Sequence, residues 1–263
     1  MDVYRNFFLL IIYLVFIVNS VPLIEINDEK QSYIVIIKSI SPNNTRTIQL
    51  LKLKKKLIAP DSEKQENPTW NLDRIDQRRL PIDNKYMFPA SEGCGVNIYV
   101  IDSGININHT DFEGRASWIA GKSLLYLIKK KDIILSISLS LAGKDFPLAN
   151  AAVKALIDLD IHVTVAAGNY FGENLCYSSP ASSPEVISTD ATNIDDLIPI
   201  FSNSGPCVDL FAPGYNITST WFGINGIKTM SGTSMASPHV AGVIALIIGQ
   251  RGNMTPAKNE GIT

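Results

Sequence analysis

Runs of apolar residues divide much of this chain into short strands and longer helices. The apolar run 96–101 is typical of a strand buried in a parallel sheet, and residues 132–140 and 161–167 predict two further strands. Between the second and third runs, residues 150–159 carry apolar side chains at helical spacing, at Ala151, Ala155, Leu156 and Leu159. A strand, a helix and a parallel strand form a right-handed crossover. The pattern therefore predicts an α/β domain with a doubly wound, mostly parallel sheet.

A further apolar stretch lies near the carboxyl end and follows a run of small residues. Residues 231–242 read SGTSMASPHVAG and lead into the apolar run 243–248. The glycines and small polar residues predict a tight turn, and apolar residues on nearly every side predict a helix that crosses the core. Pro238 agrees with a nearby helix start, because proline has no N–H to donate. Ser234 is therefore expected in the first turn of this helix.

Ser234 and Asp102 each have two interpretations. Backbone N–H groups and the helix dipole favour an anion at a helix start, so a serine there could attack a carbonyl carbon and have the resulting oxyanion stabilised. The same serine could simply cap the helix. Asp102 follows the first buried strand, at the carboxyl edge where open α/β sheets place their sites, but it could also cap the turn 102–104.

Composition points to one main domain and to the secretory pathway. A chain of 263 residues that is 46% hydrophobic can bury a substantial core, and a net charge of −2 gives no reason to expect nucleic acid as a partner. The apolar run 7–18 follows Arg5 and is short for a bilayer, so we expect residues 1–20 to be a signal peptide and the protein to be secreted or vacuolar. A membrane anchor is the alternative. Secretion would allow disulfides, and glycans on the sequons at Asn43, Asn108, Asn216 and Asn253.

The region before the main domain has a mixed character. Residues 33–38 are rich in β-branched side chains and predict a strand. The basic run 51–56 could contact an anionic surface or could simply be solvated. Residues 61–67 are polar and flanked by proline, which predicts a linker. Cys94 precedes the first core strand and is expected to be a buried thiol.

Three stretches of the sequence resemble one enzyme family. The stretch 232–242, GTSMASPHVAG, resembles the serine signature of the subtilisin-like serine proteases, peptidase family S8. Residues 68–81, PTWNLDRIDQRRLP, and 86–106, YMFPASEGCGVNIYVIDSGIN, resemble the start of the mature domain in the proteinase K and cerevisin-like branch. The resemblance covers about residues 68–248. The strand predicted at 33–38 also resembles the first strand of the inhibitory propeptide of these proteases. The resemblance therefore implies that residues 21–67 contain a truncated propeptide and a linker.

The resemblance assigns roles to particular residues. It implies that Ser234 is the nucleophile, Asp102 the orienting carboxylate and Asn169 an oxyanion donor, with peptide hydrolysis through an acyl-enzyme. Asn169 could instead be a loop residue in a left-handed conformation. The implied substrate-binding residues are Ser140, Leu141, Ala142, Ala167 and Gly168, with Ala142 standing where relatives usually have glycine. A disulfide between Cys176 and Cys207 is implied as well, which leaves Cys94 outside the bridge.

The resemblance does not predict a bound metal. Pro184, Val186 and Asn193 correspond to a calcium site in some relatives, but Asn193 replaces a carboxylate by a neutral amide, so we expect neither metal nor other cofactor.

The histidine that serves as general base in this family has no counterpart here. Its motif should follow the Asp102 strand on a helix, but residues 117–131 lead almost directly to the next strand. Of the three histidines, His109 is expected on a surface loop and His162 at the opposite edge of the sheet from Ser234. His239 is five residues beyond Ser234, which rotates it by about 140° around the helix. None is expected to reach the hydroxyl.

We therefore expect a peptidase domain at 68–263 with an internal deletion near 116–132 and a truncated carboxyl end. It would be a serine endopeptidase by family that is inactive as written. The alternatives are a non-catalytic protein that binds peptides or a protease, a non-functional fragment, and an incomplete gene model. The expected partners are a polypeptide substrate or peptide ligand and the chain's own propeptide. We expect a monomer with no stable membrane anchor.

Overall fold

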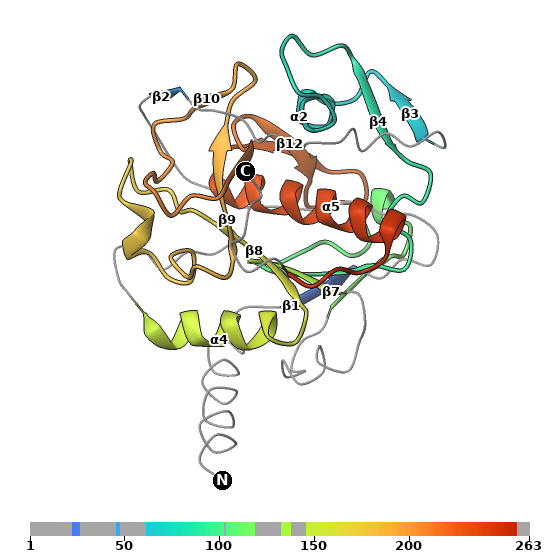
Figure 1. Cartoon of the computed structure of the whole chain (residues 1–263). Helices are drawn as coiled ribbons and strands as arrows, with labels where there is room; N and C mark the ends of the chain where they lie inside the picture. The colour runs from blue at the N-terminus through green and yellow to red at the C-terminus, as the bar shows by residue number, and fades with distance from the viewer. Residues whose placement is uncertain are drawn as a thin grey trace.

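A central sheet separates two long helices that lie on its opposite faces (Figure 1). The computed structural model describes residues 23–26, 46–47, 62–102, 104–118, 133–137 and 146–256, with the backbone alone at 23–26, 46–47, 118 and 133–137. The long helices are α4 (Pro147–Ile157) and α5 (Thr233–Arg251). The sheet strands are β1 (Leu23–Ile26), β5 (Asn97–Ile101), β6 (Ala116–Trp118), β7 (Ile133–Ile137), β8 (His162–Ala166), β9 (Ile187–Thr192) and β11 (Leu210–Pro213).

The sheet confirms the predicted α/β class. Its seven strands have the order β11-β9-β8-β7-β5-β1-β6, and the five from β11 to β5 are parallel. The apolar runs predicted as strands form β5, β7 and β8, and the predicted crossover helix is α4. The carboxyl ends of these parallel strands share one edge of the sheet, which is where the candidate site residues lie.

Strand β5 shows why these strands are apolar without alternation. Tyr99 and Ile101 belong to a buried cluster on the α4 side of the sheet, whereas Ile98 and Val100 belong to a cluster beneath α5. Successive side chains of a strand point to opposite faces, so a strand covered on both faces needs apolar residues at every position.

Helix α4 uses a different stripe from the one predicted. Its buried residues are Ala152, Val153, Leu156 and Ile157, whereas Ala151 and Leu159 are exposed. The helix ends at Ile157, so Leu159 lies in the following turn and does not share the helical register.

Helix α5 is the core helix that the apolar run predicts. It packs across β9, β8 and β7, and the Ser237 hydroxyl lies 3.1 Å from the hydroxyl of Thr164 in β8. Pro238 lies farther inside the helix than predicted, at the sixth helical residue. Within the described residues, α5 is the one helix that is long and apolar enough to cross a bilayer, but most of it is buried against the sheet. Its length therefore reflects its path through the core.

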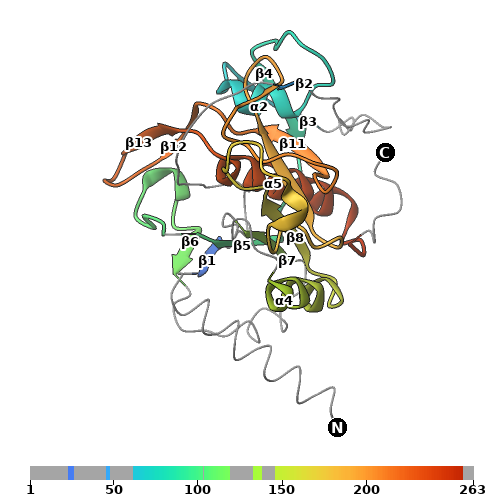
Figure 2. The ribbon, with the colours of Figure 1, turned by 90° about the vertical axis from the view of Figure 1, so that its left-hand side faces the viewer.

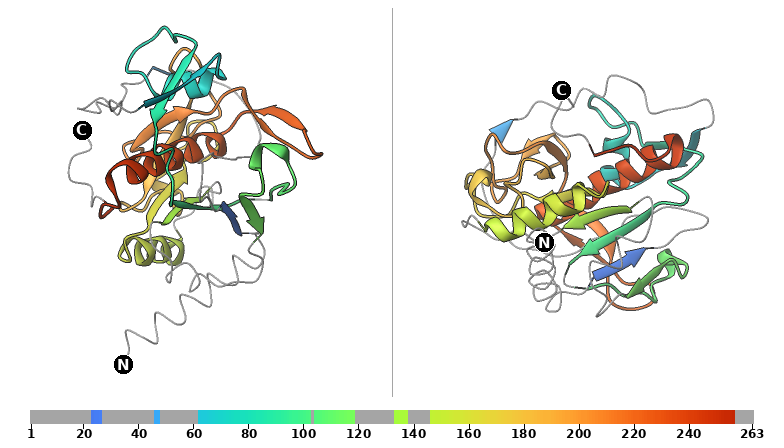
Figure 3. Two further views of the ribbon diagram at one scale, coloured as in Figure 1. Left: turned by 90° about the vertical axis from the view of Figure 1, so that its right-hand side faces the viewer. Right: turned by 60° about the horizontal axis from the view of Figure 1, so that its bottom comes forward.

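The remaining elements surround the carboxyl edge and α5 (Figures 2 and 3). They are β2 (Arg46–Thr47), β3 (Ser62–Glu66), α2 (Trp70–Ile75), β4 (Lys85–Pro89), the 3₁₀ helices η1 (Thr110–Phe112) and η2 (Leu175–Tyr177), β10 (Leu197–Ile198), β12 (Ile217–Thr220) and β13 (Ile227–Met230). Strands β12 and β13 form a hairpin that projects beyond the sheet and lies beside η1.

The prediction of a linker at 61–67 is wrong. Residues Ser62–Glu66 form β3, which pairs antiparallel with β4. The side chains of this strand are mostly exposed, so its polar composition suits a two-stranded ribbon that faces water. The strand predicted at 33–38 and the basic run 51–56 lie outside the described residues, as does the predicted signal peptide.

The amino-terminal region also contributes to the central sheet. Strand β1 lies antiparallel between β5 and β6, with Ile24 opposite Val100 and Ile26 opposite Ile98. In the described part of the sheet, β6 pairs with β1 alone, so β1 connects β6 to the other strands.

This register predicts a specific cross-link. In the double variant Ile24→Cys/Val100→Cys, the two thiols should form an intramolecular disulfide on mild oxidation, because directly opposed residues have Cβ atoms about 5 Å apart. The bridge would appear as a mobility shift on non-reducing gels and as the loss of two titratable thiols. The matched control Glu25→Cys/Val100→Cys moves one cysteine by one residue, to the other face of the sheet, and should not cross-link. Equal cross-linking of both variants would contradict the register.

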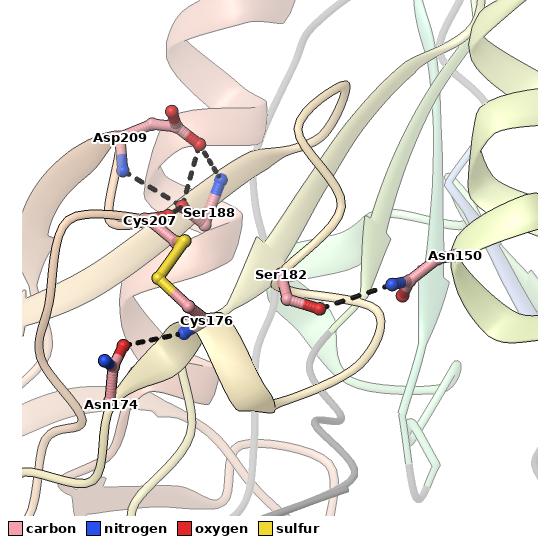
Figure 4. Close-up of a disulfide and its surroundings, with 7 residues drawn as sticks. All are labelled: Asn150, Asn174, Cys176, Ser182, Ser188, Cys207 and Asp209. Atoms are coloured by element: carbon pink, nitrogen blue, oxygen red, sulfur yellow. Dashed lines mark hydrogen bonds between the residues drawn. A yellow bond between two sulfur atoms is a disulfide. The ribbon is translucent and has the colours of Figure 1, made fainter. Parts of the chain in front are cut away.

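A disulfide joins two loops next to this sheet (Figure 4). Cys176 in η2 is bonded to Cys207, as the family resemblance implies. The Asn174 side chain accepts a hydrogen bond from the Cys176 N–H at 3.0 Å and so shapes the turn that presents this cysteine. The prediction for Cys94 is wrong, because this residue is exposed. It lies in the turn before β5, where the neighbouring Gly93 packs against α5 and Cys94 is directed outward.

Candidate active site

A tight turn positions the start of α5 at the carboxyl edge of the sheet. The Gly232 N–H donates to the Gly214 carbonyl at 2.8 Å, and a Cβ added to Gly214 would lie 2.5 Å from the Cβ of Ala191. The approach of these loops therefore requires glycine at 214. Ser234 is the second residue of α5 and is 5% exposed. The structure thus confirms the predicted place of Ser234 in the first turn of a buried helix.

Asn169 lies directly against this turn. Its Oδ1 accepts hydrogen bonds from the Thr233 N–H at 2.9 Å and from the Thr233 hydroxyl at 3.2 Å. The same hydroxyl accepts the Gly168 N–H at 3.0 Å. These bonds fix the orientation of the Asn169 amide, and its Nδ2 donates no hydrogen bond to the described residues. The amide nitrogen is the group that an oxyanion would require.

Asn203, which the sequence did not identify as a site residue, forms hydrogen bonds with the backbone on both sides of Asn169. Asn203 is fully buried; its Nδ2 donates to the Ala167 carbonyl at 2.8 Å, and its Oδ1 accepts the Tyr170 N–H at 2.9 Å. The Ala167 N–H donates to Thr189. Because the N–H groups of Ala167 and Gly168 are both used internally, their predicted contact with a substrate would have to use other atoms.

Asp102 occupies the same edge of the sheet as Asn169. It is 3% exposed and directly follows β5, whereas Asn169 follows β8. Strand β7 separates β5 from β8, so the two positions are about 10 Å apart across the sheet. The remaining predicted substrate-binding residues, Ser140, Leu141 and Ala142, follow β7 and lie outside the described residues.

His239 cannot act on Ser234 from its observed position. It is fully buried, and its ring nitrogens contact the Met235 carbonyl at 2.7 Å and the Asn71 Nδ2 at 2.8 Å. Asn71 Nδ2 is a donor, so Nε2 of His239 accepts and Nδ1 donates to Met235. Burial lowers the pKa of His239 to about 4, which keeps the ring neutral near pH 7.

The other two histidines also have partners away from Ser234. The ring of His162 contacts the Met254 carbonyl at 2.8 Å, just beyond the carboxyl end of α5. This position agrees with the prediction that His162 lies at the opposite edge of the sheet from Ser234. The prediction that His109 is a surface residue is wrong, because it is 3% exposed. Its Nε2 donates to the Gly226 carbonyl at 2.8 Å, and its Nδ1 accepts the Asp111 N–H at 3.2 Å. The loop between β12 and β13 covers it.

Asn193, one of the residues considered for calcium, is used within the fold. The Asn193 Oδ1 accepts backbone N–H groups from Asp195 at 3.0 Å and Leu197 at 2.8 Å, so it closes its own turn. Among the residues whose placement is described, no group of three or more His, Cys, Asp or Glu side chains could hold a metal ion.

The arrangement at this edge is that of a serine hydrolase scaffold of the α/β class. A buried serine lies in the first turn of the core helix, an asparagine amide lies against that turn, and a buried aspartate directly follows β5, two strands away from β8. Comparison with known proteins assigns this scaffold to a family. The model of the subtilase family, peptidase S8, matches residues 119–262.

Individual relatives agree with that match. The chain is 34% identical over 269 residues to the subtilisin-like proteinase Spm1 of Pyricularia oryzae, covering 76% of this chain and 50% of that protein. It is 32% identical over 276 residues to the subtilisin-like serine protease Cla h 9.0101 of Davidiella tassiana, covering 78% and 52%. Among solved structures, a cold adapted subtilisin-like serine proteinase has a TM-score of 0.62 at 32% identity, covering 73% of this chain and 88% of that one.

The chain belongs to the subtilase family of subtilisin-like serine proteases. It spans about half the length of the curated relatives it matches.

Proposed function

We propose that this protein is a subtilase of the secretory pathway, secreted or vacuolar, that has the fold of a serine endopeptidase but negligible peptidase activity. In the reaction of such an enzyme, serine attacks a peptide carbonyl while a histidine takes its proton, and water then hydrolyses the acyl-enzyme. The observation that carries the proposal is the position of the histidines. The sequence has three, and each is held by partners away from Ser234.

The absence of a nearby imidazole removes the activation of the nucleophile. A neutral serine hydroxyl is a weak nucleophile at pH 7 unless a base accepts its proton. Asp102 could orient a base, and the Nδ2 of Asn169 could stabilise an oxyanion, but neither replaces the proton acceptor. The described site therefore contains a candidate orienting carboxylate and a candidate oxyanion donor, but no histidine that could accept the proton of Ser234.

The alignment supports an internal deletion as the origin of this site. The match to the Pyricularia proteinase runs over 269 residues, more than the 263 of the whole chain, yet it covers 76% of the chain. The relative therefore has residues within the matched region that have no counterpart here. We place the deletion near residues 116–132, between β6 and β7. Sequencing the transcript tests this placement, and a longer message encoding a histidine motif there would overturn the proposal of inactivity.

Peptide binding without turnover is the second candidate function. It is favoured by Asn169, whose Oδ1 is fixed by Thr233 while its Nδ2 can still donate to a peptide carbonyl. We propose that the ligand is a polypeptide, and that the chain is a monomer without a stable membrane anchor. The amino-terminal region could serve as a propeptide ligand of the same site.

Fluorophosphonate labelling tests the proposed inactivity directly. The purified protein should be labelled no more than its Ser234→Ala variant, because the probe needs an activated serine. A subtilase with a complete triad is the positive control. Strong labelling that disappears in Ser234→Ala would show that a base reaches the serine. For the binding function, affinity for an extended peptide should be equal in both proteins, and a loss of binding in Asn169→Ala is expected.

A further inference from the structure

A cavity of about 590 Å³ lies beside the middle of α5, away from Ser234. Its floor includes Ile98 and Phe112, which belong to the buried cluster beneath α5. Its walls come from α2, β4, η1 and the β12–β13 hairpin. The volume falls within the range of about 300–1,000 Å³ that is typical of ligand-binding pockets. Most of the lining is apolar, so the cavity suits apolar side chains.

Helix α5 presents one face to this cavity. The residues of that face are His239, Gly242, Ala245 and Leu246, which follow helical spacing. Gly242 and Ala245 are buried within the fold, whereas Leu246 is only partly buried. Within this face, His239 and Ala245 are 2% and 1% exposed, so Leu246 is the residue that α5 offers to a partner.

The hairpin extends the apolar surface beyond the cavity. Ile227 lines the cavity and is 69% exposed, and Phe222 and Ile224 in the same hairpin are 75% and 69% exposed. The hairpin is held in place by η1 and the loop before it: the Thr110 N–H donates to the Ile224 carbonyl at 3.0 Å, and Asn106 Nδ2 donates to Gly223 at 2.7 Å. Neighbouring exposed apolar side chains on a rigid support are typical of an interaction site.

Charge on the rim indicates the chemistry of the partner. Asp111 and Glu113 line the cavity, and their side chains are 67% and 69% exposed. Arg115 also lines it, but its side chain is 11% exposed and donates to the Asp111 carbonyl at 2.8 Å. The charge that the rim presents to solvent is therefore mainly negative, and it would attract a cationic partner.

We infer that the cavity and the exposed hairpin residues form a docking surface for an amphipathic helix of a partner polypeptide. The apolar face of that helix would pack against Leu246 and Ile227, and its lysine or arginine side chains would face Asp111 and Glu113. This is the helix-in-groove mode of recognition. Leu246 is twelve residues beyond Ser234 on α5, about 18 Å along the helix axis, so docking does not depend on the serine site.

Two synthetic peptides test this inference by fluorescence anisotropy at physiological salt. One is a fluorescein-labelled Leu/Lys helix, LKKLLKLLKKLLKL, and the other is its Leu/Glu counterpart, LEELLELLEELLEL. The protein should bind the Lys peptide at least about tenfold more tightly than the Glu peptide. The double variant Asp111→Lys/Glu113→Lys should lose about tenfold in affinity for the Lys peptide and gain affinity for the Glu peptide. Phe222→Ser/Ile227→Ser should weaken binding of the Lys peptide.

Matched controls separate this surface from general attraction to an acidic protein. The double variant Glu173→Lys/Asp195→Lys changes the net charge equally at exposed positions outside the cavity lining, and it should change the affinity less than twofold. Thermal melting of each variant checks the fold. Equal binding of both peptides, or equal effects of the two charge reversals, would overturn the inference. Self-association that is abolished by Phe222→Ser/Ile227→Ser would assign the surface to a second copy of the chain and would also overturn it.

Discussion

Peptide hydrolysis by the purified protein is expected to equal that of its Ser234→Ala variant. In subtilisin itself, removal of the triad histidine lowers kcat by about 2 × 10⁶-fold. A loss of similar size is expected here, because His109, His162 and His239 all have partners away from the serine. What remains would be the contribution of substrate binding and of the amide of Asn169.

A fluorogenic peptide assay with long incubation measures this loss. The relevant comparison is the ratio of kcat/KM between the natural chain and Ser234→Ala, which should be near one. A complete subtilase assayed in parallel sets the scale, and Asn169→Ala should lower only the residual rate that the natural chain and Ser234→Ala have in common. A rate that depends on Ser234 and rises with a pKa near 7 would show that an imidazole acts as the base, and the proposed inactivity would then be wrong.

Replacement of Asp190 by alanine is expected to stabilise the protein. Asp190 lies in β9 and is fully buried. Its Oδ1 accepts the Ala191 N–H at 2.6 Å and the hydroxyl of Ser202, but Oδ2 has no hydrogen-bond partner among the described residues. A buried polar group without a partner costs about 1–3 kcal/mol. Asp190→Ala removes this cost, and the Ser202 hydroxyl can still accept the Ala191 N–H at 3.3 Å.

The increase in the free energy of unfolding caused by Asp190→Ala should become larger as pH rises. Burial raises the pKa of Asp190 well above its ordinary value, so the folded state retains a proton that the unfolded chain releases above about pH 4. The unfolded state therefore binds fewer protons between those two pKa values, and the stability of the natural protein falls as pH rises through this window. Below the unfolded pKa this penalty is absent. Asp190→Ala lacks the penalty at every pH.

Urea unfolding followed by tryptophan fluorescence between pH 4 and pH 8 measures this effect. At pH 7, Asp190→Ala should raise the free energy of unfolding by about 2 kcal/mol or more. Asp190→Asn is the matched control: it keeps the size and polarity but cannot ionise, so it should remove the pH dependence while recovering less stability. If Asp190→Ala is no more stable than the natural chain across this range, the account of a destabilising buried carboxyl is wrong.

The sequence correctly predicted the secondary-structure elements whose positions depend on the local pattern of apolar residues. Strand β5 is apolar at successive positions because it is covered on both faces, and the start of α5 follows from glycine and small residues. The stripe of α4 was misplaced because several registers of an alanine-rich helix have similar hydrophobicity. The helix end at Ile157 and the packing against β8 select one of them.

Polar partnerships between distant residues could not be predicted in this way. The ring of His109 donates a hydrogen bond to the Gly226 carbonyl in the β12–β13 loop, and the ring of His239 accepts one from Asn71, 168 residues earlier in the chain. The support of Ala167 by Asn203 and the contact between Asp190 and Ser202 have no distinguishing local sequence signal. Hydrogen bonds of this kind depend on which loops meet at the edge of the sheet.

The sequence by itself determined the α/β class, the parallel strands, the buried serine helix and the family resemblance, because apolar periodicity and a long contiguous motif are local properties of the chain. Only the tertiary structure decided that β1 enters the sheet between β5 and β6, that residues 62–66 form a strand, and which groups form hydrogen bonds with each histidine. A hydrogen-bond partner or a strand neighbour is chosen by proximity in space, and residues that are far apart in the chain become neighbours only when it folds.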